Sequence, residues 1–423
     1  MSPQVACIVG LIVLFIVGTA LPVNMGALAF VVAFIVGVNY VHMPAAAILA
    51  GFPGDLFVTL VGITYLFAIA QNNGTVDWLV RLAVRLVGGR AGAIPWVMFF
   101  VTALLTGVGA VSPGAVAIIA PVALRFAQRY RISPLLMGLM VIHGAQAGGF
   151  SPMSVYGGIT NQVVQRAALP GNDMHLFLAS LGFNFLVAVA IFFVFGGHRL
   201  LGQQASPEQP AVPPEVPDLT SSGKAGLTGQ QALTLTGLVA LGVGALIFDL
   251  NVGLVSISVA VVLTILFPKE QKRAVDQIHW STVLLICGVV TYISVLQKAG
   301  AIDFVGNSVS NATAPLIGAL LLCYVGGIVS AFASTVGVLG AIIPLAVPLL
   351  ALGQIDAVSV ISALAISSSI VDVSPFSTNG ALVLASAQGV DRDSLYRQLL
   401  AYSAVIVLLA PLLAWAILVL PNL

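Results

Sequence analysis

Three Ser-Pro dipeptides interrupt apolar stretches of this sequence, at Ser112-Pro113, Ser151-Pro152 and Ser374-Pro375. Serine favours the N-cap of a helix and proline favours its first position, so each pair predicts the start of a helix. Thr335-Val336-Gly337 predicts a fourth start without a proline. A helix start presents free backbone N–H groups and the positive end of the helix dipole, which together bind carboxylate or phosphate. The four starts therefore predict an anion site that needs no cationic side chain.

Isolated Ser-Pro pairs also occur at simple helix kinks, where the serine satisfies freed backbone groups. Here the breaks recur at matched positions of the two halves of the chain, which favours a shared binding site over separate kinks.

The charges near these breaks constrain the ligand. No lysine or arginine lies near any of them, yet an anion in a low-dielectric site needs compensation. Helix dipoles supply part of it, and co-bound Na⁺ is expected to supply the rest. Carbonyl oxygens at the ends of the preceding half-helices suit Na⁺. The relevant oxygens belong to Gly148, Gly149, Ser367, Ser368 and Ser369.

Two ionisable residues lie deep in apolar sequence beside the breaks. Asp372 precedes Ser374 by two residues, and an acid within a membrane is a functional candidate. It is expected to ligate a cation, to carry a proton, or only to cap the break. His143 precedes Ser151 by eight residues, either as a packing residue or as a substrate ligand or proton relay. Proton coupling through His143 or Asp372 is therefore the alternative to Na⁺ coupling.

The composition places these groups in a membrane. Of 423 residues, 59% are hydrophobic and 7% are charged, whereas soluble domains contain about 25% charged residues. We therefore expect the chain to lie in a lipid bilayer. Its net charge of +1 does not indicate binding to nucleic acid. Cys7, Cys287 and Cys323 lie in apolar runs without metal-ligand spacing, which predicts buried free thiols. No cofactor other than Na⁺ is expected.

Hydropathy predicts the spanning helices, since a bilayer core needs about 20 apolar residues per helix. The candidate spans are residues 4–21, 25–42, 56–72, 133–165, 174–196, 231–248, 251–267, 282–298, 356–389 and 399–420. Stretches 133–165 and 356–389 contain Ser-Pro breaks and are predicted broken helices. Stretches 93–125 and 314–351 are interrupted at their middles and are predicted re-entrant hairpins, because irregular backbone at membrane depth must be covered by protein or water.

The two halves of the chain match each other at a nearly constant offset. Residues 21–26 match 248–253 at an offset of 227, and residues 151–157 match 374–380 at 223. Further matches pair Gly62, Gln71, Gly74 and Asp77 with Gly288, Gln297, Gly300 and Asp303, and Ser112, Gly114 and Pro121 with Thr335, Gly337 and Pro344. Collinear matches of this kind indicate an internal repeat.

Each half then has five crossings, and because five is odd the second half is inserted upside down. We expect an all-α polytopic membrane protein of two inverted repeats of five transmembrane helices, each with a re-entrant hairpin and a broken helix. The repeats are residues 1–202 and 231–423. Residues 203–230, rich in proline, serine and acids, are the predicted linker.

The positive charges predict the orientation in the inner membrane. With the linker in the cytoplasm, both termini are external, and only Arg166 and Lys298 fall outside. The residues that fall inside are Arg81, Arg85, Arg90, Arg125, Arg129, Arg131, Arg199, Lys224, Lys269, Lys272, Arg273, Arg392 and Arg397. Residues 75–90 are amphipathic and predict a helix along the inner interface.

Residues 132–159, ISPLLMGLMVIHGAQAGGFSPMSVYGGI, resemble the signature of MatC-type malonate/dicarboxylate carriers, and residues 21–37 resemble that family too. More broadly, the layout resembles the ion transporter superfamily, which includes divalent-anion/sodium symporters. The resemblance implies a homodimer with a scaffold domain and a transport domain that moves like an elevator. It also implies a small dicarboxylate held between hairpin tips and broken-helix starts, with Na⁺ beside each tip.

The resemblance implies two sets of ligands. The substrate ligands are Ser112, Pro113, Gly114, Ser151, Ser154, Tyr156, Thr335, Ser374, Ser377, Thr378 and Asn379. The Na⁺ ligands are Ser112, Gly149, Ser151, Thr335, Gly337, Asp372, Ser374 and Ser377. The symporters carry Ser-Asn-Thr at both hairpin tips, whereas residues 111–114 and 334–337 read Val-Ser-Pro-Gly and Ser-Thr-Val-Gly here. The second broken helix has Ser-Thr-Asn where the first has Ser-Val-Tyr, so we expect an asymmetric pocket in which Tyr156 caps one end of the substrate.

Na⁺-coupled uptake of malonate or a similar dicarboxylate is the leading expectation, and no enzymatic activity is expected. The alternatives are a proton-coupled dicarboxylate carrier and an inorganic-ion antiporter of the same superfamily. An intramembrane serine hydrolase at Gly149-Phe150-Ser151 is disfavoured, because Pro152 follows the serine and the break is paired in the other half.

Overall fold

The computed structural model describes most of the chain. The described residues are 2–21, 23–86, 90–201, 227–248, 250–268, 273–301, 304, 315–332, 335–350, 353–387 and 389–422. Within them the chain forms eighteen α-helices and no β-strand, which confirms the all-α prediction. Most of the predicted linker, residues 203–226, lies outside the described residues, as do Asp303, Ser334, Lys224, Lys269, Lys272 and the side chains of Arg81 and Arg85.

The described residues of the first half form ten α-helices. They are α1 (Pro3–Ala20), α2 (Met25–Asn39), α3 (Ala45–Leu49), α4 (Gly54–Asn72), α5 (Thr75–Leu86), α6 (Ile94–Gly107), α7 (Ser112–Arg129), α8 (Pro134–Gly148), α9 (Val155–Arg166) and α10 (Asp173–Val194). The amphipathic segment 75–90 thus forms helix α5, and short 3₁₀ turns lie at Ala91–Ala93 and Gly197–Leu200.

The second half contains eight described helices in a similar order. They are α11 (Gly229–Leu246), α12 (Val252–Leu266), α13 (Trp280–Lys298), α15 (Pro315–Ser330), α16 (Thr335–Leu350), α17 (Ala357–Ile370), α18 (Thr378–Ala385) and α19 (Arg392–Leu418), which a 3₁₀ turn at Leu420–Asn422 follows. The last two residues of the predicted linker are therefore the start of α11.

The broken-helix stretches contain two helices each, α8 with α9 and α17 with α18. The hairpin stretches also contain two helices each, α6 with α7 and α15 with α16, and the two arms of each pair contact one another. The breaks between these helices place four helix starts in the interior of the protein.

Glycines allow two close helix crossings that join the halves. On α2, a Cβ at Gly26 would lie 2.0 Å from the Leu284 carbonyl oxygen of α13, and one at Gly288 would lie 2.0 Å from the Gly26 oxygen. On α4, a Cβ at Gly62 would lie 2.5 Å from the Gly253 oxygen of α12. Small residues let helix backbones approach this closely. Gly26 and Gly62 are the repeat partners of Gly253 and Gly288, so each half crosses the other in the same way.

Asparagine caps precede both crossing helices. The Asn24 side chain accepts hydrogen bonds from the N–H groups of Gly26 and Ala27, and Asn251 accepts one from Leu254. Both asparagines are therefore the N-caps of their helices. Cys7, Cys287 and Cys323 are free and buried, as predicted.

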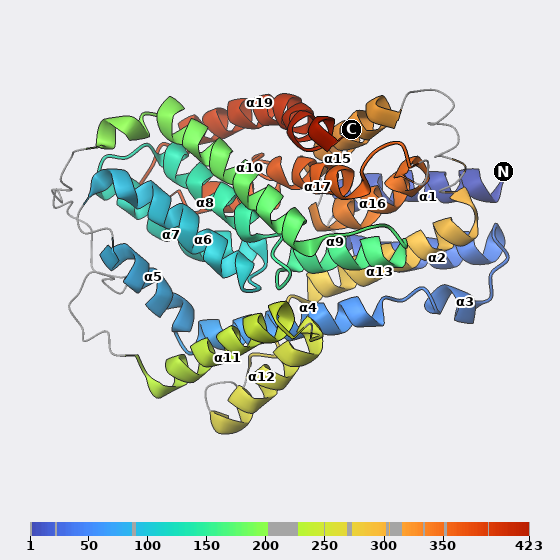
Figure 1. Cartoon of the computed structure of the whole chain (residues 1–423), viewed down its shortest axis with the longest axis horizontal. Helices are drawn as coiled ribbons and strands as arrows, with labels where there is room; N and C mark the ends of the chain where they lie inside the picture. The colour runs from blue at the N-terminus through green and yellow to red at the C-terminus, as the bar shows by residue number, and fades with distance from the viewer. Residues whose placement is uncertain are drawn as a thin grey trace.

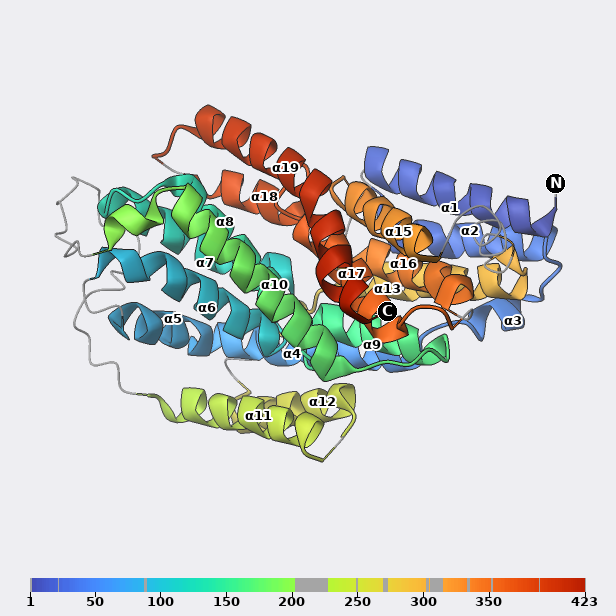
Figure 2. The same cartoon turned by 45° about the horizontal axis from the view of Figure 1, so that its top comes forward.

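Helix contacts divide the described helices into two groups, seen in Figure 1 and, after rotation, in Figure 2. One group contains α1–α4 and α11–α13, with the α11–α12 pair packed on α4 and the α1–α2 pair on α13 at the other end. The other group contains α6–α10 and α15–α19. The groups meet mainly where α13 contacts α16 and α4 contacts α9, and α5 contacts both α4 of the first group and α6 of the second.

Four of the described helices are long and apolar enough to cross a membrane: α4, α10, α13 and the continuous run Arg392–Asn422. Eight shorter apolar helices accompany them. Together with the hydrophobic composition, these helices indicate a multi-pass membrane protein.

Candidate functional site

The break between α8 and α9 is a hydrogen-bonded turn around two serines. The Ser151 hydroxyl donates to the Gly107 carbonyl oxygen at 2.8 Å and accepts from the Met153 N–H at 3.2 Å. The Ser154 hydroxyl donates to the carbonyl oxygens of Gly149 and Ser151 and accepts from the Gly157 N–H. Ser154 is therefore the N-cap of α9, and Ser151 closes the turn before it.

The break between α17 and α18 repeats this turn. The Ser374 hydroxyl accepts from the Phe376 N–H at 3.2 Å, and the Ser377 hydroxyl donates to the Ser374 oxygen at 2.7 Å. Ser377 occupies the N-cap position of α18. The prediction that Ser151-Pro152 and Ser374-Pro375 begin the half-helices was wrong by one turn, because both Ser-Pro pairs build the turn.

The other two predicted starts lie at helix starts. Helix α7 begins at Ser112 with Val111 as its N-cap, so Ser112 and Pro113 are its first two residues and the Ser112 hydroxyl is not used as a cap. Helix α16 begins at Thr335, whose hydroxyl lies 2.9 Å from that of Ser330 on α15.

These four helix starts meet in one buried cluster, which we call the central cluster: Ser112, Tyr156, Thr335, Asp372 and Asn379. The Asn379 amide donates to the Ser112 hydroxyl at 2.9 Å, and the Tyr156 hydroxyl lies near the hydroxyls of Ser112 and Thr335. All five side chains are at least 96% buried. Ser112 and Thr335 are 223 positions apart, as are Tyr156 and Asn379, so the cluster is built from repeat-matched positions of both halves.

Asp372 fills the start of α18. Its carboxylate accepts hydrogen bonds from the Asn379 amide at 2.8 Å and the Asn379 N–H at 3.4 Å, and it lies near the Thr378 N–H. The Ser377 hydroxyl also lies within hydrogen-bond reach of it. No lysine or arginine pairs with Asp372 in the described part of the chain. The carboxylate therefore lies where an anion would bind at this helix start. Within the described residues, its negative charge is stabilised by the helix dipole and by neutral hydrogen-bond donors and not by a cationic side chain.

The matching position at the start of α9 is Gly149, which lies 223 residues before Asp372. Glycine offers no carboxylate there. The start of α9 thus keeps its positive dipole end, while the start of α18 has an internal negative charge. The two halves of the central cluster differ in this charge and in the pair of Tyr156 and Asn379.

Not every predicted site residue reaches the cluster. Gly114 lies beside the His279 ring, where a Cβ added to the glycine would be 3.6 Å from Nε2, and Gly337 lies against Met25 and Leu285. Pro113 is half-buried, and Thr378 is exposed and contributes its backbone N–H. Ser151, Ser154, Ser374 and Ser377 support the two breaks from within the turns.

The sequence analysis missed Gln146. This fully buried residue near the end of α8 donates from its amide to the Ser369 carbonyl oxygen of α17 at 2.9 Å. Gln146 and Ser369 are themselves 223 positions apart, so the repeat offset was the signal that would have found the contact. The Ser367 carbonyl oxygen faces Gly327 of α15, and the Ser368 hydroxyl faces Gly326.

His143 is bonded away from the central cluster. Its Nδ1 lies 3.0 Å from the Asn184 amide oxygen, and its Nε2 lies 2.7 Å from the Tyr402 hydroxyl. The Asn184 amide nitrogen donates to the Ser180 carbonyl oxygen, so its oxygen is free to accept from Nδ1–H. A neutral His143 thus satisfies both partners and ties α8 to α10 and α19, which favours the packing interpretation.

We therefore expect His143→Gln to destabilise the protein by about 1–3 kcal/mol, the cost of unsatisfied buried polar groups, with an uptake pH profile that does not change. Tyr402→Phe, which removes one of the two bonds, should give a smaller loss. Thermal unfolding and pH-dependent uptake of the purified variants would check this. A flattened pH profile in His143→Gln would instead support a proton relay.

Two cavities lie along the helices that begin in the central cluster. The α7/α18 cavity has a volume of about 210 Å³. Its lining residues are Ala117, Pro121, Leu124, Arg125, Leu382, Ala385 and Ser386. The α9/α16 cavity has a volume of about 150 Å³. Its lining residues are Ala50, Gly51, Val163, Arg166, Val290, Ile293, Ser294, Gln297, Gly340 and Pro344. Each cavity runs along two helices whose starts belong to the cluster, and each is lined by one arginine.

Comparison with known proteins agrees with this architecture. Residues 1–149 match a family described as the N-terminus of the dicarboxylate carrier protein MatC, which confirms the resemblance predicted from the sequence over that region. No curated protein sequence matches the chain.

The fold is similar to that of a solved transporter. A crystal structure of the Alcanivorax borkumensis YdaH transporter, described as having an unusual topology, superposes with a TM-score of 0.64 at 12% sequence identity. The alignment covers 98% of this chain and 98% of that one. The chain therefore shares the overall fold of that protein.

Proposed function

We propose that this chain, whose residues 1–149 match the MatC carrier family, is a secondary active transporter that takes up malonate or a similar small dicarboxylate together with Na⁺. The observation that carries the proposal is the central cluster. It joins four helix starts, hydroxyl and amide groups and one buried carboxylate, without a lysine or arginine among its members. Such a site suits an anion that arrives with its own cation.

The site divides between two ligands. A substrate carboxylate is expected at the start of α9, beside the Tyr156 hydroxyl, because that helix start carries no internal anion. Na⁺ is expected beside Asp372, whose buried carboxylate otherwise lacks a cation. Bound Na⁺ then lowers the repulsion between the Asp372 carboxylate and the dianion. Because the dianion binds well only when Na⁺ is present, substrate transport is coupled to Na⁺ transport.

We propose that the chain consists of two inverted repeats with re-entrant hairpins, and that these repeats open the central cluster to one side of the membrane and then to the other. This is supported by the matched glycine crossings, by the contact between Gln146 and Ser369, and by the two equivalent cavities. Pro121 and Pro344, 223 positions apart, line one cavity each. In carriers with inverted repeats, one repeat exposes the site to each side in turn.

The two groups of helices suggest how the site moves. We propose that α1–α4 and α11–α13 form a scaffold, through which two copies form a homodimer in the inner membrane. Helices α6–α10 and α15–α19 then carry the central cluster past it in an elevator-type motion. Both termini are proposed to be external and the linker cytoplasmic, as the distribution of arginine and lysine predicts.

A thermal-shift panel of mono- and dicarboxylates, in Na⁺ and in choline, tests the function. We expect malonate or a close homologue to raise the Tm of the purified protein only when Na⁺ is present. At a hundred times its Kd a ligand adds about 2.7 kcal/mol to stability, which the assay resolves. Stabilisation in choline together with uptake driven by a pH gradient would assign the coupling to protons. No response to any dicarboxylate would contradict the proposal and favour an inorganic ion.

Two substitutions should separate the site from an ordinary helix cap. Asn379→Ala removes the amide that bonds both Ser112 and Asp372, and we expect malonate affinity to fall by at least about tenfold, since bonds to charged groups contribute about 1.5–3 kcal/mol. Ser377→Ala should weaken Na⁺ or malonate affinity in the same direction. Asn24→Ala removes a helix cap and the hydrogen bond from the Asn24 amide to the Ser281 carbonyl oxygen, both outside the central cluster, so it should lower Tm and leave affinity unchanged. Equal affinities in all three variants would contradict the assignment.

A further inference from the structure

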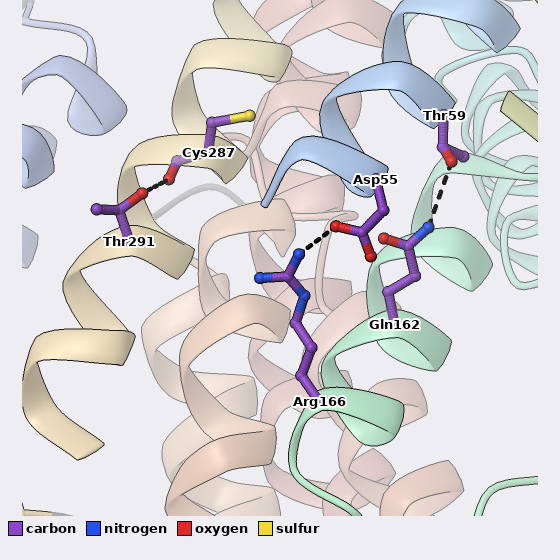
Figure 3. Close-up of polar contacts among 6 residues, drawn as sticks. All are labelled: Asp55, Thr59, Gln162, Arg166, Cys287 and Thr291. Atoms are coloured by element: carbon purple, nitrogen blue, oxygen red, sulfur yellow. Dashed lines mark hydrogen bonds and ion pairs between the residues drawn. The ribbon is translucent and has the colours of Figure 1, made fainter. Parts of the chain in front are cut away.

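An arginine lines the α9/α16 cavity and is held by a carboxylate of the protein itself. Arg166 is the last residue of α9, and its guanidinium forms an ion pair with Asp55 in the first turn of α4. Figure 3 shows the two side chains pointing toward each other, with Gln162 and Thr59 bonded at 3.3 Å one turn away. These contacts join α9, a helix of the central cluster, to the helix group that does not contain it.

Arg166 is the one charged residue among those that line this cavity. The other polar lining groups are the Ser294 hydroxyl and the Gln297 amide of α13. Val163 and Arg166 on α9 face Gly340 and Pro344 on α16, and these helices begin beside Tyr156 and at Thr335. The cavity therefore lies between the two helices whose starts belong to the central cluster, and Arg166, a partly exposed cation, is among its lining residues.

Asp55 shows which chemistry fits beside the cation. Its carboxylate accepts a hydrogen bond from Arg166 Nη2, and guanidinium groups bind carboxylates in this way in general. The Arg166 and Asp55 side chains retain 35% and 46% of their exposure. An ion pair with this exposure contributes little to stability, so a second carboxylate can exchange with Asp55 at small cost.

We propose that the α9/α16 cavity is an access subsite for carboxylate anions, in which Arg166 recognises the substrate and Asp55 is an internal competitor. This inference rests on the proposed function and extends it with a specificity-determining residue outside the central cluster. With no substrate present, Asp55 occupies Arg166. An arriving dicarboxylate displaces Asp55, binds Arg166 and passes along α9 to the central cluster. The exchange also releases one of the contacts between α9 and α4.

The proposal makes opposite predictions for the two partners of the ion pair. Asp55→Asn removes the competitor, so the KM for malonate should fall by about threefold, within the range that exposed ion pairs allow. Arg166→Gln removes the recognising cation, so KM should rise by about fivefold, and Arg166→Lys should give an intermediate value because it keeps charge without the planar fork. Initial malonate uptake by intact cells measures these constants. Both effects should shrink at high ionic strength, because exposed charges are screened.

Controls separate the subsite from a structural link and from net charge. Arg397→Gln removes an exposed arginine of α19 that lines neither cavity, and it should leave KM unchanged. In the purified variants, malonate should raise the Tm as in the wild type, since that shift reports the central cluster. If Asp55→Asn and Arg166→Gln shift KM in the same direction, the pair is only a link between helices and the subsite is overturned. If wild-type protein shows no malonate-induced Tm shift, the proposed function itself fails.

Discussion

Replacing Gly149 with aspartate should abolish malonate binding, while Gly149→Ala should retain most of it. Asp372 occupies the equivalent position in the second half, and its carboxylate accepts a hydrogen bond from the Asn379 N–H at the start of α18. An aspartate at position 149 would occupy the start of α9 in the same way. It would also place a second buried negative charge in the central cluster. We expect affinity to fall by at least about a hundredfold, because an uncompensated buried charge costs about 3–5 kcal/mol.

The backbone at Gly149 permits this experiment. Its φ of −64° and ψ of −15° suit any residue. A Cβ there would lie 3.1 Å from the Ala145 oxygen and 3.2 Å from Tyr156 Cδ2, which is tight enough to shift neighbours slightly, so Gly149→Ala measures that steric cost alone. Malonate titrations by calorimetry in Na⁺ compare the variants. Equal malonate affinities in the two variants would show that the start of α9 is not where a substrate carboxylate binds.

Hydropathy and repeat matching predicted the helices well because both depend on many residues at once. The stretch 133–165 contains α8 and α9, and the stretch 314–351 contains α15 and α16. Caps such as Asn24 and Asn251 were also predictable, since their partners lie two or three residues along the chain.

The register of the half-helix starts was not predictable, because long-range contacts set it. The preference of Ser-Pro for helix starts is local, whereas the Ser151 hydroxyl bonds the Gly107 carbonyl 44 residues earlier. That contact commits Ser151 to the turn and moves the cap to Ser154. The statistics of single helices contain no information about this partner.

The charge asymmetry of the site was half visible in the sequence. Asp372 was identified as a buried acid, but its role at the start of α18 depends on a chain reversal that brings it to Asn379, seven residues later. Comparison across the repeat offset would have shown Gly149 opposite Asp372. The ion pair of Arg166 and Asp55 was not foreseeable, since 111 positions separate its partners and both lie outside any motif.

Asp372→Asn is expected to remove Na⁺ dependence from malonate binding and to abolish Na⁺-driven uptake. The carboxylate repels a dianion bound at the start of α9, and Na⁺ offsets that repulsion in the wild type. Without the charge, malonate should raise the Tm equally in Na⁺ and in choline. Removing one partner of a buried ion pair costs about 3–5 kcal/mol. Because the variant removes the carboxylate that holds Na⁺, uptake driven by a Na⁺ gradient should fall by at least about a hundredfold. The Asn side chain keeps one acceptor for Asn379 and presents one donor to it, so a lower Tm is expected as well.

Asp356→Asn is the matched control. Asp356 caps α17 through the Ser359 N–H at 2.8 Å, and asparagine caps a helix about as well as aspartate. This variant should keep both the Na⁺ dependence of the malonate-induced Tm shift and Na⁺-driven uptake. If Asp372→Asn behaves like Asp356→Asn in both assays, the carboxylate at the start of α18 is only a helix cap. The coupling ion must then bind at the opposite break, beside Gly149 and Ser151, where the carbonyl oxygens at the end of α8 are its available ligands.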